Sequence, residues 1–183
     1  AKPPSGSPTP GQCAQPKIFA ASNGLPSLSM YHTAFEYFEH NAFMATTMDD
    51  LVAYLSERIG GQRSVEAKVR AAVRAHVSFH LNRQKENFIA NSELRGLSTA
   101  HYRAIVQKRD EYETIFQDLI RRGAAEGVFA DLDVKILSYA ILTLCTAGAT
   151  WYNPGGRLRV GEIADIYEKF IINGLKQGKT DIP

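Results

Sequence analysis

The stretch Trp151-Tyr152-Asn153-Pro154-Gly155-Gly156-Arg157 separates two segments that both favour helices. Pro154 cannot continue a helix, and the two glycines after it permit a sharp change of direction. The segment before the stretch is apolar and rich in small residues. The segment after it repeats apolar side chains at the i, i+3, i+4, i+7 spacing of an amphipathic helix. The sequence therefore predicts a helical hairpin at the end of the chain.

An apolar face of this length needs a covering surface, and a second copy of the chain is the simplest one. The small residues at 147–149 would let two helices approach closely. We therefore predict a homodimer through the last two helices. The expected contact residues are Leu144, Gly148, Ile163, Ile166, Tyr167, Phe170 and Ile171.

The composition of the chain indicates a globular protein with a hydrophobic core. Its 183 residues are 44% hydrophobic and carry a net charge of only +2, which does not by itself indicate a nucleic-acid-binding protein. The two cysteines, Cys13 and Cys145, lie in very different surroundings, so a disulfide framework is not expected. We find neither an apolar run near the roughly 18 residues of a membrane span nor a signal peptide. These features predict a cytoplasmic protein.

Helix signals become regular from about residue 46. Thr46 or Thr47 is predicted to cap a helix that Gly60-Gly61 ends, and Ser64 to cap a second helix that reaches about Ala90. Ser98 or Thr99 is expected to begin a third helix, and Asp131 or Asp133 to cap the one that leads to Trp151. No stretch alternates with period two, so the predicted fold class is all-α.

The ends of the chain differ from this regular part. Residues 1–16 are rich in proline and are expected to be mobile. Residues 17–45 contain many aromatic side chains without a clear period, and we expect short helices broken near Asn23-Gly24 and Pro26. Residues 46–176 form the predicted helical domain, and residues 177–183 are assigned to a tail.

Residues 87–175 resemble the tetracycline-repressor (TetR/AcrR) family of transcriptional regulators. Five segments carry the resemblance in order: Asn91 to Ser98, Lys108 to Glu113, Gly123 to Phe129, Trp151 to Leu158, and Glu162 to Asp165. They are similar to the C-terminal effector domain of the branch that senses acyl-thioesters and related lipid-degradation intermediates. The resemblance implies a ligand-binding and dimerisation domain that follows an N-terminal helix-turn-helix headpiece.

Two registers of the helix-turn-helix fit the residues before position 46. In one, residues 24–32 form the turn and the recognition helix, which would place Ser27, Ser29, Tyr31 and His32 on DNA. In the other, residues 35–40 form the element that closes the headpiece. The Pro-rich residues 1–16 cannot supply the first helix that the family has at this point. The headpiece is therefore interpreted as partial or degenerate, and DNA binding is implied by the resemblance.

Polar and aromatic residues on the inner helical faces predict a small-molecule cavity, because such cavities are apolar with a few polar groups. The candidate ligand-binding residues are His76, Phe79, His80, Phe88, Asn91, Tyr112, Phe116, Thr143, Thr146 and Trp151. A basic cluster of Arg95, Arg103, Lys108 and Arg109 could meet the phosphates of a coenzyme A ligand under the family reading, although a solvated charged face explains it better.

No set of residues predicts an enzyme, a cofactor or a metal. His76 and His80 have a spacing that can bind zinc, but no third ligand accompanies them in a known motif. Helix capping explains the paired aspartates at 49–50 and at 131 and 133 better than catalysis does, and Cys145 is expected to be a buried thiol.

Together these observations predict a homodimeric, ligand-responsive regulator, a repressor, whose partners are operator DNA and a small hydrophobic or acyl-CoA-like effector, with no membrane partner. The alternative is a dimeric helical ligand-binding or interaction module that does not bind DNA.

Overall fold

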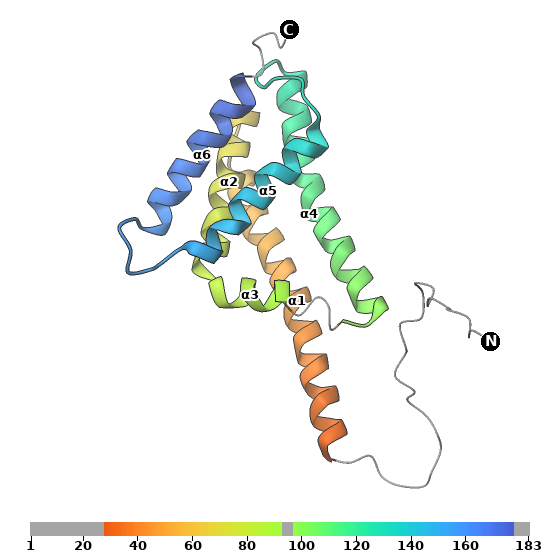
Figure 1. Cartoon of the computed structure of the whole chain (residues 1–183). Coiled ribbons are helices and arrows are strands. Elements are labelled where there is room, and N and C mark those ends of the chain that lie inside the picture. The colour runs from red at the N-terminus through yellow and green to blue at the C-terminus, as the bar shows by residue number, and fades with distance from the viewer. Residues whose placement is uncertain (1–27, 93–96, 178–183) are drawn as a thin grey trace, which may run out of the picture.

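The computed structural model describes residues 28–92 and 97–177, with side chains described for 44–88 and 97–176. Within these residues all regular elements are α-helices (Figure 1), which confirms the predicted all-α fold class. Their order is α1 (Leu28–Gly60), α2 (Val65–Asn82), α3 (Gln84–Ser92), α4 (Thr99–Ala125), α5 (Val134–Trp151) and α6 (Val160–Gln177).

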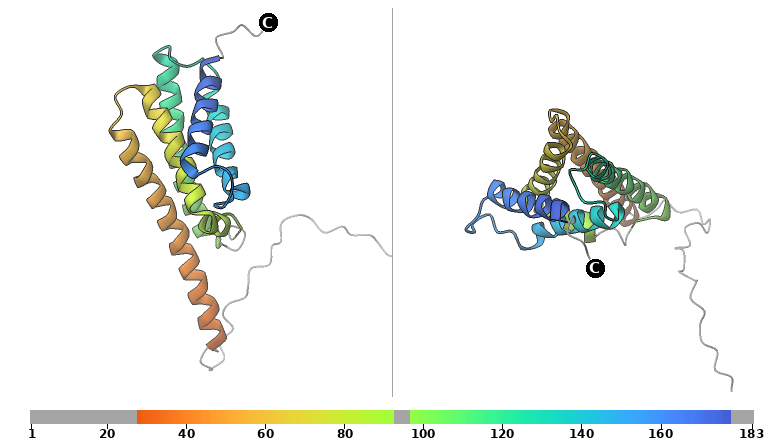
Figure 2. Two further views of the ribbon diagram at one scale, coloured as in Figure 1. Left: turned by 90° about the vertical axis from the view of Figure 1, so that its left-hand side faces the viewer. Right: turned by 90° about the horizontal axis from the view of Figure 1, so that it is seen from above.

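Helix α2 lies at the centre of the bundle and contacts every other helix. Figure 2 shows α1 on one side of α2 and α4, with α5 and α6 on the opposite side. The first half of α1 extends beyond the other helices (Figure 1). The core between the helices is apolar, and its largest fully buried side chains are Phe116, Phe129, Leu55, Ile120, Ile172, Val69, Val73 and Val77.

Helix α2 begins at the predicted cap Ser64, and of the alternatives left open for α4 and α5 the caps are Ser98 and Asp133. The hydroxyl of Ser64 accepts a hydrogen bond from the backbone N–H of Ala67, and that of Ser98 accepts one from His101. The carboxylate of Asp133 accepts from two backbone N–H groups at the start of α5. Each such cap stabilises its helix by about 1 kcal/mol because the first N–H groups have no partner within the helix.

Helix α1 differs from the sequence expectation, because it does not begin at Thr46 or Thr47. It is continuous from Leu28 to Gly60, so the expected boundary between residues 45 and 46 falls inside a helix. The physical reason is that no glycine or proline occurs between Leu28 and Ile59, so nothing interrupts helical hydrogen bonding. The breaks expected near Asn23-Gly24 and Pro26 lie outside the described residues.

The second predicted helix, from Ser64 to about Ala90, is two helices. The chain leaves helical geometry at Arg83, with φ of −120° and ψ of 45°, and resumes as α3. The Arg83 guanidinium stacks over the Phe79 ring at 4.5 Å and donates a hydrogen bond to the Asp50 carboxylate on α1. The contact with Asp50 is a tertiary one that favours the break, and local propensity does not reveal it.

The turn after α4 depends on two glycines. Gly127 has a φ of 69°, a conformation that side chains disfavour. Gly123 lies directly beneath the ring of Phe129, where a Cβ atom would overlap the ring. The following residue, Ala130, donates its backbone N–H to the Leu175 carbonyl of α6. The two glycines therefore let the loop fold back onto α4 and reach the end of α6.

Most of the apolar seam of α6 lies against α2 within the same subunit, so Ile163 and Ile171, which were expected to face a partner, are already covered. Its residues Ile163, Ile171, Ile172 and Leu175 are all buried. The bend after α5 is a tight turn in which the Asn153 side chain accepts the N–H of Gly155. Since α2 is the main neighbour of α6, the final helices cover one central helix and do not form an isolated hairpin.

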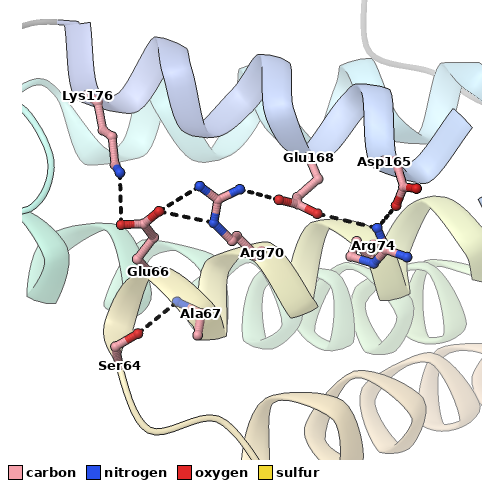
Figure 3. Close-up of polar contacts among 8 residues, drawn as sticks. All are labelled: Ser64, Glu66, Ala67, Arg70, Arg74, Asp165, Glu168 and Lys176. Atoms are coloured by element: carbon pink, nitrogen blue, oxygen red, sulfur yellow. Dashed lines mark hydrogen bonds and ion pairs between the residues drawn. The ribbon is translucent and has the colours of Figure 1, made fainter. Parts of the chain in front are cut away.

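A row of ion pairs joins α2 to α6 along the edge of this contact. Figure 3 shows it running from Lys176 to Glu66, Arg70, Glu168, Arg74 and Asp165. Glu168 is buried and accepts hydrogen bonds from both Arg70 and Arg74. Two hydrogen-bonded guanidinium groups compensate the cost of burying this carboxylate. The row therefore fixes how α6 lies along α2.

Helix α5 is more apolar than the sequence reading allowed. Within the described part of the chain, α5 is long and apolar enough to cross a membrane, with a mean hydropathy of 1.3 over its 18 residues. The expectation that no apolar run approaches 18 residues was wrong. Core helices of soluble proteins share such a composition, but only 28% of the residues of this helix are buried within the subunit. A large part of its apolar surface is thus uncovered.

Candidate effector cavity

A cavity of about 530 Å³ lies between α1, α2, α3, α4 and α5. This volume falls in the range typical of small-molecule sites. The wall is mostly apolar with several polar groups, and it is formed by Met44, Thr47, Met48, His76, Phe79, His80, Arg83, Glu86, Asn87, Ile105, Arg109, Tyr112, Glu113, Tyr139, Leu142, Thr143, Thr146 and Ala147.

His76 forms the centre of a polar chain in this wall. Its Nδ1 atom lies 2.7 Å from the Tyr112 hydroxyl oxygen, and its Nε2 atom lies 3.0 Å from Thr146 Oγ1. Burial lowers the pKa of His76 well below its ordinary value and raises that of Tyr112 well above. Both groups are therefore neutral at pH 7, and the chain joins α2, α4 and α5 without a net charge.

His80 lies one turn further along α2, with its ring centroid 4.4 Å from that of His76. Burial lowers the pKa of His80 to about 4, although a hydrogen bond with the Asn87 side chain favours the charged form. The nearby charge of Arg109 acts in the same direction as burial. Two adjacent neutral imidazoles thus line the cavity, and since both nitrogens of His76 are engaged within the protein, His80 is the one that could also bind a ligand polar group.

The charged side chains of the cavity wall come from α3, from α4 and from Arg83 between α2 and α3. The Oε2 atom of Glu86 is buried without a hydrogen bond, and it lies 3.5 Å from Arg83 Nε. Burial lowers the pKa of the Arg109 guanidinium. On α4, Glu113 accepts hydrogen bonds from Ser138 and Gln117. This part of the wall could hold the polar end of a ligand, and the remainder an apolar body.

The structure brings most of the predicted ligand-binding residues together. Those of the predicted residues that line the cavity are His76, Phe79, His80, Tyr112, Thr143 and Thr146. Phe116 lies behind this wall in the core, with its ring centroid 5.9 Å from that of His76. It supports the histidine and does not face the cavity.

Two predicted ligand-binding residues, Phe88 and Trp151, lie elsewhere. Phe88 is 73% exposed on α3, because the break at Arg83 rotates α3 away from the face of α2. Trp151 is 56% exposed at the end of α5, where its side chain hydrogen-bonds to Tyr167 of α6. The side chain of Asn91 lies outside the described residues. In this subunit Phe88 and Trp151 do not contribute to the cavity wall.

The predicted ligand-binding residues did not include any residue of α1. Met44, Thr47 and Met48 line the cavity, and Met44 lies in the segment 17–45 that was assigned to the headpiece region. Their i, i+3, i+4 spacing was an available signal for one helical face. Arg109 was also interpreted as part of a solvated face, but it lies in the wall.

No group of three His, Cys, Asp or Glu side chains in the described part of the chain is arranged to hold a metal ion. Both ring nitrogens of His76 are already hydrogen-bonded within the protein. Cys145 is buried, and burial raises the pKa of its thiol to about 12, which makes it a poor nucleophile.

The predicted interface residues fall into two groups. Leu144, Ile166 and Phe170 are exposed and available to a partner. Gly148, Ile163 and Ile171 are buried within the subunit, and Tyr167 is partly buried beside Gly148. The reason is that α6 turns its seam toward α2, which leaves the opposite side of the helix outward. The outward apolar surface also includes Ile136 on α5.

The predicted DNA-binding residues lie at the far end of α1. Ser29, Tyr31 and His32 fall in its first turns, whereas Ser27 lies outside the described residues. This end of α1 projects beyond the other helices (Figure 1). A single helix therefore connects the candidate DNA-binding residues to the cavity wall at Met44 and Met48.

More than half of the chain matches a known protein family. Residues 62–175 match the family described as "Tetracyclin repressor-like, C-terminal domain". No curated protein matches the chain significantly. Among solved structures, a tetR-family regulatory protein from Rhodococcus RHA1 is 19% identical, with a TM-score of 0.73 over 82% of this chain and 80% of its own.

Two other solved structures share the fold. The ketosteroid transcriptional regulator KstR2 of Mycobacterium tuberculosis is 20% identical, with a TM-score of 0.73 over 81% of this chain and 78% of its own. AibR, solved in complex with isovaleryl coenzyme A and operator DNA, is also 20% identical, with a TM-score of 0.69 over 77% of each chain. The family match covers more than half of the sequence, and the chain therefore belongs to the TetR/AcrR family of transcriptional regulators.

Proposed function

We propose that this protein is a homodimeric repressor that binds operator DNA and releases it when a small hydrophobic or acyl-CoA-like molecule occupies the cavity. The observation that carries the proposal is the shared use of α1. The same helix lines the cavity at Met44, Thr47 and Met48 and continues to the candidate DNA-binding residues. A molecule in the cavity would therefore contact the same helix that carries the candidate DNA-binding residues.

Two ion pairs hold α1 where it leaves the bundle. Asp50 accepts a hydrogen bond from Arg83 Nη1 at 2.8 Å, and Asp49 pairs with Lys108 of α4. Arg83 also lines the cavity. A ligand that changes the position of Arg83 would alter this hold on α1, which is the differential contact that an effector needs to shift a two-state equilibrium.

The chemistry of the wall supports the proposed class of effector. An apolar acyl or ring system fits the surface made by Met48, Phe79, Ile105 and Leu142, with the neutral imidazole of His80 as a hydrogen-bonding group. Arg109 supplies a positive charge for the polar part of the ligand. A structural neighbour, AibR, was solved with isovaleryl coenzyme A and operator DNA, which makes this ligand class a reasonable first probe.

Dimerisation follows from the same proposal, since a palindromic operator presents two half-sites about 34 Å apart. A change of a few Å between two headpieces would prevent them from docking together in successive major grooves. The exposed apolar residues of α5 and α6 supply the surface for this dimer. We also propose that the protein acts in the cytoplasm, where the operator is.

A gel-shift experiment tests the proposal. We expect the protein to retard a palindromic fragment from its own promoter region at low salt, and isovaleryl or longer acyl coenzyme A to reverse the retardation. Free coenzyme A is the matched control and should have little effect.

Absence of retardation with and without the thioesters would contradict the repressor proposal. If calorimetry then showed thioester binding, the alternative of a ligand-binding module without DNA binding would be favoured.

A further inference from the structure

The α5 wall of the cavity is also part of the outer surface of the subunit. Tyr139, Thr143 and Ala147 occupy successive turns of α5, and all three line the cavity. All three are also exposed, so no other part of the described chain covers this edge. The subunit by itself therefore leaves the cavity open along α5.

The apolar surface expected to meet a partner begins immediately beside this edge. Ala147 follows Leu144 by three residues, which places it about 60° away around the helix. Leu144 is exposed, as are Ile136 and Trp151 on the same side of α5. A helix packed on Leu144 at the usual separation of about 8–10 Å would also contact Ala147. Covering the apolar surface thus covers the cavity edge.

A second copy of the chain fits this surface better than a charged partner would. Between Ile136 and Tyr152 the sequence of α5 contains no charged residue. In a two-fold contact the same patch meets itself, so a charged residue would face its own copy. An uncharged apolar patch avoids that repulsion, and the neighbouring exposed Ile166 and Phe170 on α6 extend it.

We propose that the cavity is a site shared by two subunits, in which the partner's α5 closes the edge formed by Thr143 and Ala147. This inference rests on the proposed homodimer. It adds that an isolated subunit has an incomplete site, so ligand affinity and dimer stability are linked. A ligand held by both subunits would tighten the dimer, and dilution to monomers would weaken ligand binding.

Thiol labelling tests the geometry without a known ligand. Cys13 is first replaced by serine, and Cys145 contributes little because it is buried and its pKa is raised to about 12. Thr143→Cys then reports on the cavity edge, and Gln107→Cys on an exposed site of α4. We expect maleimide to modify Thr143→Cys at least tenfold more slowly than Gln107→Cys in the dimer.

Substitution of the dimer surface should remove this protection. Phe170→Glu, on α6 and outside the cavity wall, is expected to give monomers in which both reporters react at similar rates. Leu132→Glu, an exposed leucine in the loop before α5, is the matched control and should retain protection. If Phe170→Glu does not fold by circular dichroism, dilution of the unsubstituted reporter supplies the same comparison.

Sedimentation velocity on the same samples separates two kinds of failure. A parent protein that is monomeric would overturn the homodimer and the shared site together. A dimeric parent in which Thr143→Cys reacts as fast as in the monomer would overturn the shared site and leave the homodimer intact.

Discussion

The Nδ1 atom of His76 lies 2.7 Å from the hydroxyl oxygen of Tyr112, and this contact joins α2 to α4 at the wall of the cavity. Because burial keeps the imidazole neutral, one ring nitrogen donates a hydrogen bond and the other accepts one. Both nitrogens have partners, since Thr146 lies on the other side. The central histidine is therefore held in one orientation by residues from two other helices.

Removal of the Tyr112 hydroxyl should destabilise the protein. Tyr112→Phe leaves a buried nitrogen of His76 without its partner, and we expect the free energy of unfolding in urea to fall by about 1–3 kcal/mol. Tyr102→Phe is the control, because the Tyr102 side chain is exposed and lies outside the cavity wall, so loss of its hydroxyl should change stability by less than about 0.5 kcal/mol. Equal effects of the two substitutions would contradict the role assigned to the contact.

The free energy of unfolding should decrease as the pH is lowered from about 6.5 to 5. The pKa of His80 is lowered to about 4 and that of His76 well below its ordinary value, so both stay neutral in the folded protein. In the unfolded chain they take up protons near pH 6.5. The unfolded state then binds more protons, and the free energy of unfolding falls as pH falls, by up to about 1.4 kcal/mol per pH unit for each histidine.

Urea titrations at pH 7.5, 6.0 and 5.0 measure this dependence. His80→Gln should reduce the slope, because one of the two titrating groups is removed. A free energy of unfolding that stays constant over this range would show that the histidines are accessible to protons in the folded state.

Loss of the Glu168 charge should loosen α6 on α2. Glu168→Gln leaves Arg70 with Glu66 and Arg74 with Asp165, so we expect a moderate cost of about 1–2 kcal/mol in urea unfolding. Asp118→Asn removes the carboxylate of an exposed pair with Arg121 and should cost less than about 0.5 kcal/mol. A cost for Glu168→Gln no larger than for Asp118→Asn would mean that the row in Figure 3 contributes little.

Gly123 should not accept a side chain. In Gly123→Ala the new methyl group would overlap the Phe129 ring, and we expect a loss of about 1–3 kcal/mol in stability. Gly161→Ala is the matched substitution at the start of α6, where a Cβ meets no atom within 4 Å. It should be neutral or stabilising by up to about 1 kcal/mol, because alanine favours a helix. Thermal unfolding of the two variants measures this difference, and equal midpoints would contradict the prediction.

The exposed surface of α5 should control the oligomeric state. Leu144 on α5 and Leu132 in the preceding loop have the same exposed fraction, 39%, which makes them a matched pair. We expect Leu144→Glu to shift the protein to monomers in sedimentation velocity, because it buries a charge in a two-fold contact. Leu132→Glu should remain dimeric. If both variants are dimeric, the interface lies elsewhere on the molecule.

Local sequence signals predicted several elements of this fold correctly. The capping residues Ser64, Ser98 and Asp133 were identifiable because a cap depends only on hydrogen bonds to backbone groups two or three positions along. The placement of His76 and His80 on an inner face followed from helical periodicity in the same way. Such interactions lie within one or two turns, so the sequence contains all the information they require.

The tertiary structure alone decided which faces are covered and what forms the cavity. The sequence shows that α6 has an apolar seam, but only packing determines that Ile163 and Ile171 meet α2 while Phe170 stays outside. The break at Arg83 depends on Asp50, which is distant in sequence, and α1 enters the cavity wall because the bundle places Met44 and Met48 beside α2 and α4. Periodicity shows that a helix has an apolar face, whereas its neighbour is chosen by contacts between residues far apart in the chain.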